Sequence, residues 1–201
     1  MLLALGCAIA HADDELASPE SRWSIGLETS HLFNTIPNPF WMLAGRRGKH
    51  NRKNPLNYEL ATQVIGGQYR LGEASGWRFL RGYWQFETAL IYSQILHGPE
   101  DYWGGIMVGF RYNFVPQDSR WMPYVEMRGG YGLTNASRIR YGQQQDSTFA
   151  YLLDTGVGYQ ATPRYRISAG VMEQHLSNFY QTHPNFGFDV MGFNLRVDRS
   201  F

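Results

Sequence analysis

The sequence has little of what soluble globular proteins and helical membrane proteins usually contain. It holds one cysteine in 201 residues, so it has neither a disulfide framework nor a cysteine-based metal site. Charged residues make up 17% of it, against roughly 25% in soluble domains, and no apolar run approaches the roughly 18 residues of a membrane-spanning helix. The net charge of +1 gives no electrostatic reason to bind nucleic acid. These absences exclude a disulfide scaffold, a helical membrane protein and a nucleic-acid partner.

Lysine is scarce as well, whereas aromatic residues and glycine are abundant. Only Lys49 and Lys53 occur among the 18 basic residues, and the others are arginine. Soluble surfaces use lysine freely, while arginine is favoured at paired, poorly hydrated sites. Aromatic residues make up 15% of the chain and there are 22 glycines, a composition that excludes disorder. What remains is one domain of a size that closes a small barrel.

The N-terminus carries an export pattern. The first twelve residues, MLLALGCAIAHA, are short and apolar and end in a small-residue triplet at Ala10–Ala12, which is typical of a secretory signal peptide. The usual basic start is missing, so either the true start lies upstream or the chain is mis-started. We expect residues 1–12 to be a signal peptide, truncated at its start, and residues 13–201 to form the exported domain. Lipidation of Cys7 is disfavoured because Leu5 is misplaced for a lipoprotein signal.

From Trp23 onward the dominant hydrophobic period is two, which predicts β-strands. Eight extended segments bounded by turn residues cover residues 22–33, 58–71, 77–96, 102–115, 120–134, 147–161, 164–177 and 187–201. Most are longer than an ordinary globular strand and long enough to cross a bilayer with tilt. Tight connections after the second, fourth and sixth segments alternate with longer ones, and the chain ends on Phe201 after a period-two apolar run. We predict an all-β fold, an eight-stranded antiparallel transmembrane β-barrel of the Gram-negative outer membrane.

The polar faces of these segments carry opposite charges in equal number. The acids are Glu28, Glu87, Glu126 and Asp154, and the bases are Arg81, Arg111, Arg128 and Arg196. Such a set can neutralise itself inside a barrel, although alternation alone also fits a soluble barrel or sandwich with these charges in water. An eight-stranded barrel is just filled by its own side chains, so size disfavours a porin. Function is then expected on a face, in the loops or in a small lumen.

One predicted hairpin brings three chemically suggestive residues together. His175 and Ser177 are two apart on a strand and point to the same side, which their apolar neighbours identify as the lipid-facing side. If the hairpin is symmetric about residue 182, Asp189 lies opposite His175 within side-chain reach. Asp189 then orients the imidazole while His175 takes the Ser177 proton, the arrangement of a serine hydrolase. Glu173, on the same face, is a rival orienting residue.

These residues resemble the PagL-type lipid A 3-O-deacylases of Gram-negative outer membranes. The resemblance rests on H-L-S-N at 175–178, on the Pro184-Asn185-x-Gly187 turn and on an acid fourteen positions after the histidine. It implies an eight-stranded barrel with a serine esterase site on its outer surface, facing the outer leaflet, that removes the 3-position acyl chain of lipid A. It also implies that Ser177 is the nucleophile, His175 the general base and Asp189 the residue that holds the histidine, with Asn178 a contributor to the oxyanion hole.

The chain departs from the family pattern at two places. Asn178 is followed by Phe179 and Tyr180, where the family commonly continues with alanine and glycine. The best-known members carry glutamate at the position of Asp189. The motif similarity covers about 25 residues, whereas the barrel pattern covers nearly the whole exported domain.

The first long connection adds a cluster of fixed positive charges. Its members are Arg46, Arg47, Lys49, Arg52 and Lys53. They are candidates for contacts with the phosphates of lipid A, and a solvated loop beside anionic lipopolysaccharide is an equally good interpretation.

The sequence therefore predicts an outer-membrane serine esterase that acts on lipid A, with no metal and no organic cofactor. Two alternatives stay open: a non-catalytic structural or adhesive barrel, and a lipid A acyltransferase that uses the same nucleophile. The chain is expected to be a monomer or a homodimer, and the sequence does not choose between them.

Overall fold

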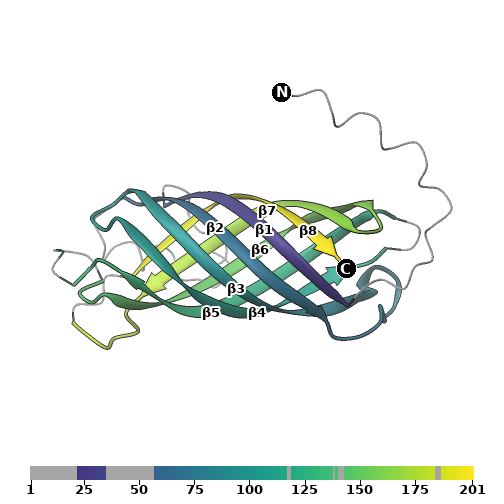
Figure 1. The fold of residues 1–201 in the computed structure, drawn as a ribbon, viewed down its shortest axis with the longest axis horizontal. Helices are drawn as coiled ribbons and strands as arrows, with labels where there is room; N and C mark the ends of the chain where they lie inside the picture. Colours follow the sequence, from purple (N-terminus) through teal and green to yellow (C-terminus); the bar gives the residue numbers. More distant parts are fainter. Residues whose placement is uncertain (1–21, 35–56, 117–118, 138, 140–142, 184–186) are drawn as a thin grey trace, which may run out of the picture.

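In the computed structural model, the described residues are 22–34, 57–116, 119–137, 139, 143–183 and 187–201. They form a closed barrel in which every strand pairs antiparallel with its neighbours in sequence and the first pairs with the last (Figure 1). The strands are β1 (Trp23–Phe33), β2 (Glu59–Arg70), β3 (Gly82–His97), β4 (Tyr102–Phe114), β5 (Trp121–Thr134), β6 (Ser147–Thr162), β7 (Tyr165–Ser177) and β8 (Phe188–Ser200). The predicted fold class and strand order are confirmed.

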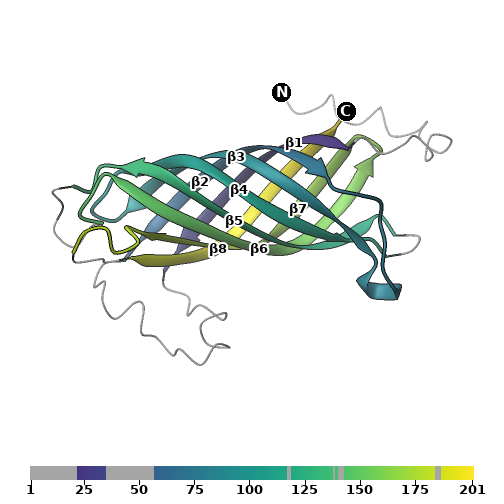
Figure 2. The ribbon, with the colours of Figure 1, turned by 90° about the horizontal axis from the view of Figure 1, so that it is seen from below.

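The β2–β3 connection differs from the tight turn that the sequence predicted. β3 begins at Gly82, not at residue 77, because Arg78–Leu80 form a short 3-10 helix, η1. Gly76 and Arg78 both have positive φ, 108° and 47°, and the chain reverses there. The connection extends beyond the barrel end that also carries the C-terminus (Figure 2).

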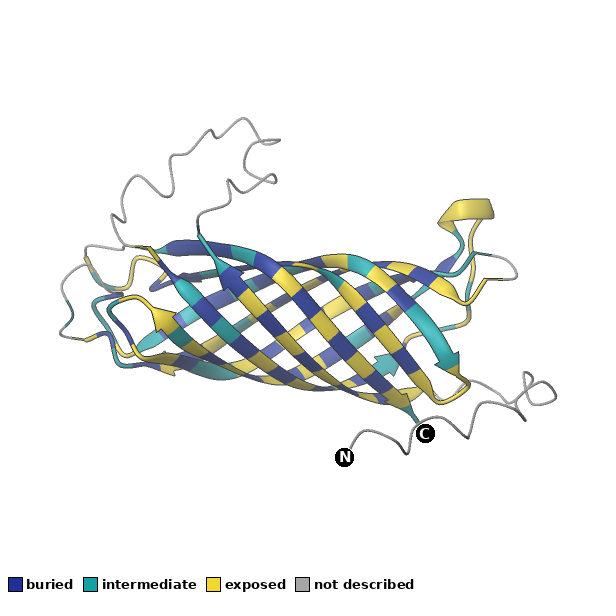
Figure 3. Cartoon of the chain, turned by 90° about the horizontal axis from the view of Figure 1, so that it is seen from above, coloured by how far each residue is buried: buried dark blue, intermediate teal, exposed yellow. Residues whose placement is uncertain are grey.

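The outward face of the barrel is apolar around its whole circumference. Buried and exposed residues alternate along the strands (Figure 3). Every strand exposes at least one large apolar side chain near its middle, namely Leu27, Ile65, Leu90, Ile106, Met127, Val157, Val171 and Leu195. Aromatic pairs such as Trp23–Tyr69 and Trp121–Tyr159 lie at the end that carries the C-terminus. An apolar band flanked by aromatic residues is the outer surface of a membrane barrel.

No helix among the described residues is long and apolar enough to cross a membrane.

The half of the interior nearer the C-terminus is a network of paired charges. Arg128 donates to Glu28 at 2.9 Å, and Arg196 donates to Glu87 at 2.9 Å. One of the eight residues in the predicted set is not part of it: Arg81 lies in the β2–β3 connection, where it donates to a backbone carbonyl of the next turn. Arg166 fills that role instead, because it sits on the inward face of β7 and pairs with Asp198.

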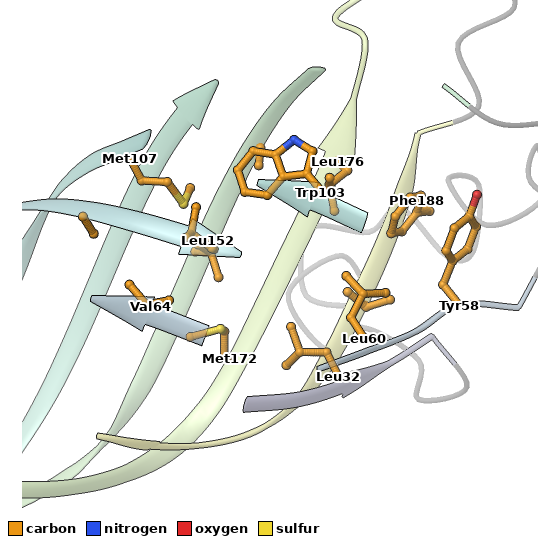
Figure 4. Packing of buried hydrophobic residues seen from close by; sticks show 14 residues of the cluster. Leu32, Tyr58, Leu60, Val64, Trp103, Met107, Leu152, Met172, Leu176 and Phe188 are labelled. Atoms are coloured by element: carbon orange, nitrogen blue, oxygen red, sulfur yellow. The ribbon is translucent and has the colours of Figure 1, made fainter. Parts of the chain in front are cut away.

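The other half of the interior is packed with apolar side chains (Figure 4). The cluster comprises Leu32, Tyr58, Leu60, Val64, Ala89, Ile91, Trp103, Met107, Ala150, Leu152, Met172, Leu176, Phe188 and Val190. It lies inside the barrel next to the end of β7 and the start of β8, where the predicted site residues are. A packed core holds strands in one arrangement, so this cluster gives the site a rigid backing from inside the barrel.

Candidate active site

The β7–β8 hairpin has the register that the sequence predicted. His175 pairs with Asp189, and their neighbours Val171 and Phe193 are exposed on the outward face. The two site residues share that face but are themselves largely buried, with exposed side-chain fractions of 15% and 6%. Charged groups on the lipid-facing side of a barrel are costly, so these two residues are expected to be paired.

His175 and Asp189 form a short hydrogen bond. The distance from Nδ1 to Oδ1 is 2.6 Å. Because an ionised carboxylate only accepts hydrogen bonds, the Nδ1 proton is donated to Asp189. In the neutral ring this leaves Nε2 as the basic nitrogen.

A second contact fixes the plane of the imidazole. Tyr151, the β6 residue directly opposite His175, stacks on the ring with centroids 4.8 Å apart and planes inclined by 18°. Tyr151 is a site residue beyond those predicted from the sequence. A signal for it exists, because positions 151 and 175 are equally distant from position 163, which lies in the tight turn between β6 and β7.

Ser177 lies two residues beyond His175 on the same face and is buried. The backbone of Gly187 closes the space beside both residues. A Cβ at Gly187 would come within 3.1 Å of the Ser177 Cβ and 3.4 Å of the His175 Cε1. A side chain at this position would crowd both residues, so the glycine lets the start of β8 lie close to Ser177 and His175.

The rival orienting residue, Glu173, takes a different place. It is buried on the same face one step further from the strand end, and the Tyr151 hydroxyl donates to its Oε1 at 3.5 Å. The carboxylate bonded to Nδ1 of His175 is that of Asp189. The geometry therefore favours Asp189 as the orienting acid. Glu173 contacts the hydroxyl of the stacked tyrosine instead.

Asn178 is fully buried and its side chain binds the surrounding loops. Nδ2 donates to the carbonyl oxygen of Gln143 at 2.9 Å and to the hydroxyl of Thr182 at 2.8 Å. Oδ1 accepts the backbone N–H of Tyr180 at 2.9 Å. An oxyanion role for this side chain stays a prediction. It requires that one Nδ2–H group of Asn178 releases its loop oxygen and donates to the oxyanion of the substrate instead.

A buried acid anchors the same loops from within the barrel end. Glu100, between β3 and β4, accepts hydrogen bonds from the Tyr58 hydroxyl at 2.9 Å and from the backbone N–H of Gln143 at 3.2 Å. Burial raises the pKa of Glu100, and these hydrogen bonds act in the opposite direction. Tyr58 in turn stacks on Phe188, the residue before Asp189. Glu100 thus connects two segments of the site. Through Gln143 it is linked to Asn178, and through Tyr58 it is linked to Phe188.

Two further predictions concern the basic cluster and metal binding. The five basic residues at 46–53 lie outside the described residues. Within the described part of the chain, there is no group of three or more histidine, cysteine or acidic side chains placed to hold a metal ion.

The comparisons with known proteins agree with this fold. The architecture is that of the small outer-membrane β-barrels. Residues 56–198 match the family described as lipid A 3-O-deacylase (PagL). The matched segment is more than half of the chain. The chain belongs to this family, and it is an outer-membrane protein.

Solved structures share the fold at low sequence identity. The crystal structure of the outer membrane enzyme PagL is 16% identical with a TM-score of 0.55, over 87% of this chain and 99% of that one. The crystal structure of Neisserial surface protein A is 15% identical with a TM-score of 0.57, over 90% of this chain and 98% of that one. At these identities the likeness concerns the fold alone. No curated protein sequence matches the chain.

Proposed function

We propose that this protein is a serine esterase that removes the ester-linked 3-hydroxyacyl chain from the 3-position of lipid A. The observation that carries the proposal is the 2.6 Å pair of His175 and Asp189 on the outward face of a membrane barrel, beside Ser177. A polar site on that face meets the lipids of the membrane leaflet. Membership of the lipid A 3-O-deacylase family supplies the substrate class.

The position of the site along the barrel fits such a substrate. Ser177 is the last residue of β7, at the end that carries the connections β1–β2 and β5–β6. Outer-membrane barrels face their longer loops outward, which supports a position of the site at the outer leaflet. The ester bonds of lipid A lie between its sugar headgroup and its hydrocarbon chains, so they meet the barrel at the strand ends.

The proposed mechanism uses three side chains. His175 Nε2 accepts the Ser177 proton as the hydroxyl attacks the ester carbonyl, and Asp189 stabilises the imidazolium that forms. The tetrahedral intermediate collapses when the imidazolium protonates the departing 3-oxygen of the sugar, which leaves as a hydroxyl. A water molecule, activated by the same histidine, then hydrolyses the acyl-serine and restores the enzyme. Asn178 is our candidate donor to the oxyanion during both steps.

Covalent labelling tests this assignment directly. A fluorophosphonate reacts with a serine hydroxyl only where a neighbouring base activates it. We expect the detergent-solubilised protein to be labelled, with the adduct mapped to Ser177 by peptide mass spectrometry, and the His175→Ala variant to lose the label. A folded barrel that stays unlabelled, or that is labelled at another serine, contradicts the mechanism.

The basic cluster gives a separate prediction about substrate recognition. We propose that Arg46, Arg47, Lys49, Arg52 and Lys53 contact the lipid A phosphates through charge-assisted hydrogen bonds. Replacing all five with glutamine is expected to raise KM for phosphorylated lipid A about tenfold or more, with a much smaller effect on a neutral short-chain ester. Steady-state kinetics on both substrates checks it, and equal losses on both would mean that the cluster supports folding instead.

A further inference from the structure

Two large exposed aromatic residues follow Ser177 and Asn178 directly. Phe179 and Tyr180 have exposed fractions of 72% and 64%, and both have positive φ, 52° and 62°. The carbonyl oxygen of Asn178 accepts the backbone N–H of Gln181 at 3.0 Å. Two central residues with positive φ closed by such a bond form a type I′ turn.

This turn is occupied by residues that suit it poorly. Type I′ turns prefer asparagine and glycine, because a Cβ and a bulky side chain are disfavoured at positive φ. Here the Asn178 side chain, through its contacts with Tyr180 and Thr182, holds the turn in place. Backbone strain that the surroundings enforce clusters at functional sites, so the two aromatic side chains call for a reason beyond folding.

The same aromatic surface continues past Ser177 onto the neighbouring strands. The ring centroid of Phe179 lies 5.4 Å from that of Phe149 on β6, and Phe149 lies 4.9 Å from Tyr131 on β5. Phe149 is the strand partner of Ser177. An apolar path thus runs from the turn, beside Ser177, across two strands of the outward face.

On the opposite side of Ser177, the described residues are packed against the site or bonded within it. The backbone of Gly187 is packed against Ser177 and His175, and Asp189 is committed to the imidazole. Among the described residues, an acyl chain whose carbonyl carbon is bonded to Ser177 therefore has a continuous aromatic surface toward Phe149 and Phe179.

We infer that Phe179, Tyr180 and Phe149 hold the acyl chain of the ester that is cleaved, and that this surface sets the preference for long chains. The inference rests on the proposed esterase function. Interfacial aromatic residues anchor barrels in the membrane without any strained backbone. Their place in a strained turn directly after the nucleophile favours contact with the substrate over simple anchoring.

The test replaces the turn by its preferred residues in the double variant Phe179→Asn, Tyr180→Gly. The purified barrel is assayed in one detergent with 4-nitrophenyl myristate and 4-nitrophenyl butyrate. We expect kcat/KM for the myristate to fall about tenfold more than that for the butyrate, the size of effect that lost apolar contacts have on specificity. The thermal unfolding temperature should rise as strain is released. A matched control, Phe79→Asn, removes an equally exposed aromatic at the opposite barrel end and should leave the myristate-to-butyrate ratio unchanged.

The outcomes separate this inference from the function on which it rests. If the wild-type protein hydrolyses neither ester, the esterase proposal fails. If the wild type is active and the double variant keeps its ratio, or loses both activities equally, the acyl-surface inference alone is overturned. A lower unfolding temperature would mean that the aromatic residues stabilise the turn, and it also counts against the inference. If the double variant does not fold, Phe179→Asn alone is measured, and the same ratio decides.

Discussion

Replacement of Ser177 by alanine is expected to reduce lipid A deacylation by at least about a thousandfold, because it removes the proposed nucleophile. His175→Ala removes the proposed base and is expected to cost a similar factor. Residues that act as one unit are strongly non-additive, so the double variant should be little worse than either single variant. The measurement is the rate of 3-hydroxy fatty acid release from purified lipid A by the solubilised barrel.

The fold must be shown to survive in these variants. Membrane barrels migrate differently on gels before and after heating, and the folded fraction is read from that shift. Ser168→Ala is the matched control, since Ser168 is on the same strand but buried on the inward face, so its rate should remain near that of the wild type. Full activity of a folded Ser177→Ala protein would remove Ser177 from the mechanism.

Asp189→Asn should give the next largest loss, about a hundredfold or more. An asparagine at this position no longer stabilises the imidazolium, and it allows the tautomer with the proton on the wrong nitrogen. Glu173→Gln is the matched comparison, because it is also a buried acid on the same face but is bonded to Tyr151. We expect it to reduce the rate less than about tenfold, since a single hydrogen bond contributes about 1 kcal/mol.

One outcome would contradict the assignment of Asp189 as the orienting acid. If Glu173→Gln abolishes deacylation while Asp189→Asn is silent, the orienting acid is Glu173. Rates measured on the same folded fractions as above decide between the two.

The barrel and the hairpin register could be predicted because both follow from a strict period of two. Alternation determines which face of a strand is outward, and a short symmetric hairpin determines which residues face one another. That is why the pairing of His175 with Asp189 was predictable from residue numbers. Tyr151 was accessible to the same arithmetic through the β6–β7 turn, but alternation does not distinguish a tyrosine that stacks on a histidine from one that faces lipid.

Other features depend on interactions that alternation does not encode. The late start of β3 follows from positive φ at Gly76 and Arg78. Arg81 therefore lies before the strand, although the alternation of the sequence predicted it on the polar face inside the barrel. The division of the interior into an ionic half and an apolar half follows from contacts among all eight strands. The strained turn at Phe179 and Tyr180 depends on the Asn178 side chain, whose partners come from two different loops.

The mass of lipid A distinguishes an esterase from the other two candidate functions. Purified lipid A is incubated in detergent with the folded wild-type protein or with the Ser177→Ala variant. We predict that the wild type lowers the lipid A mass by one ester-linked 3-hydroxyacyl chain, that the free hydroxy acid appears in equal amount, and that the variant leaves the mass unchanged. An unchanged mass with the folded wild type would contradict the esterase proposal and favour a non-catalytic barrel, and a gain of one acyl chain would identify an acyltransferase instead.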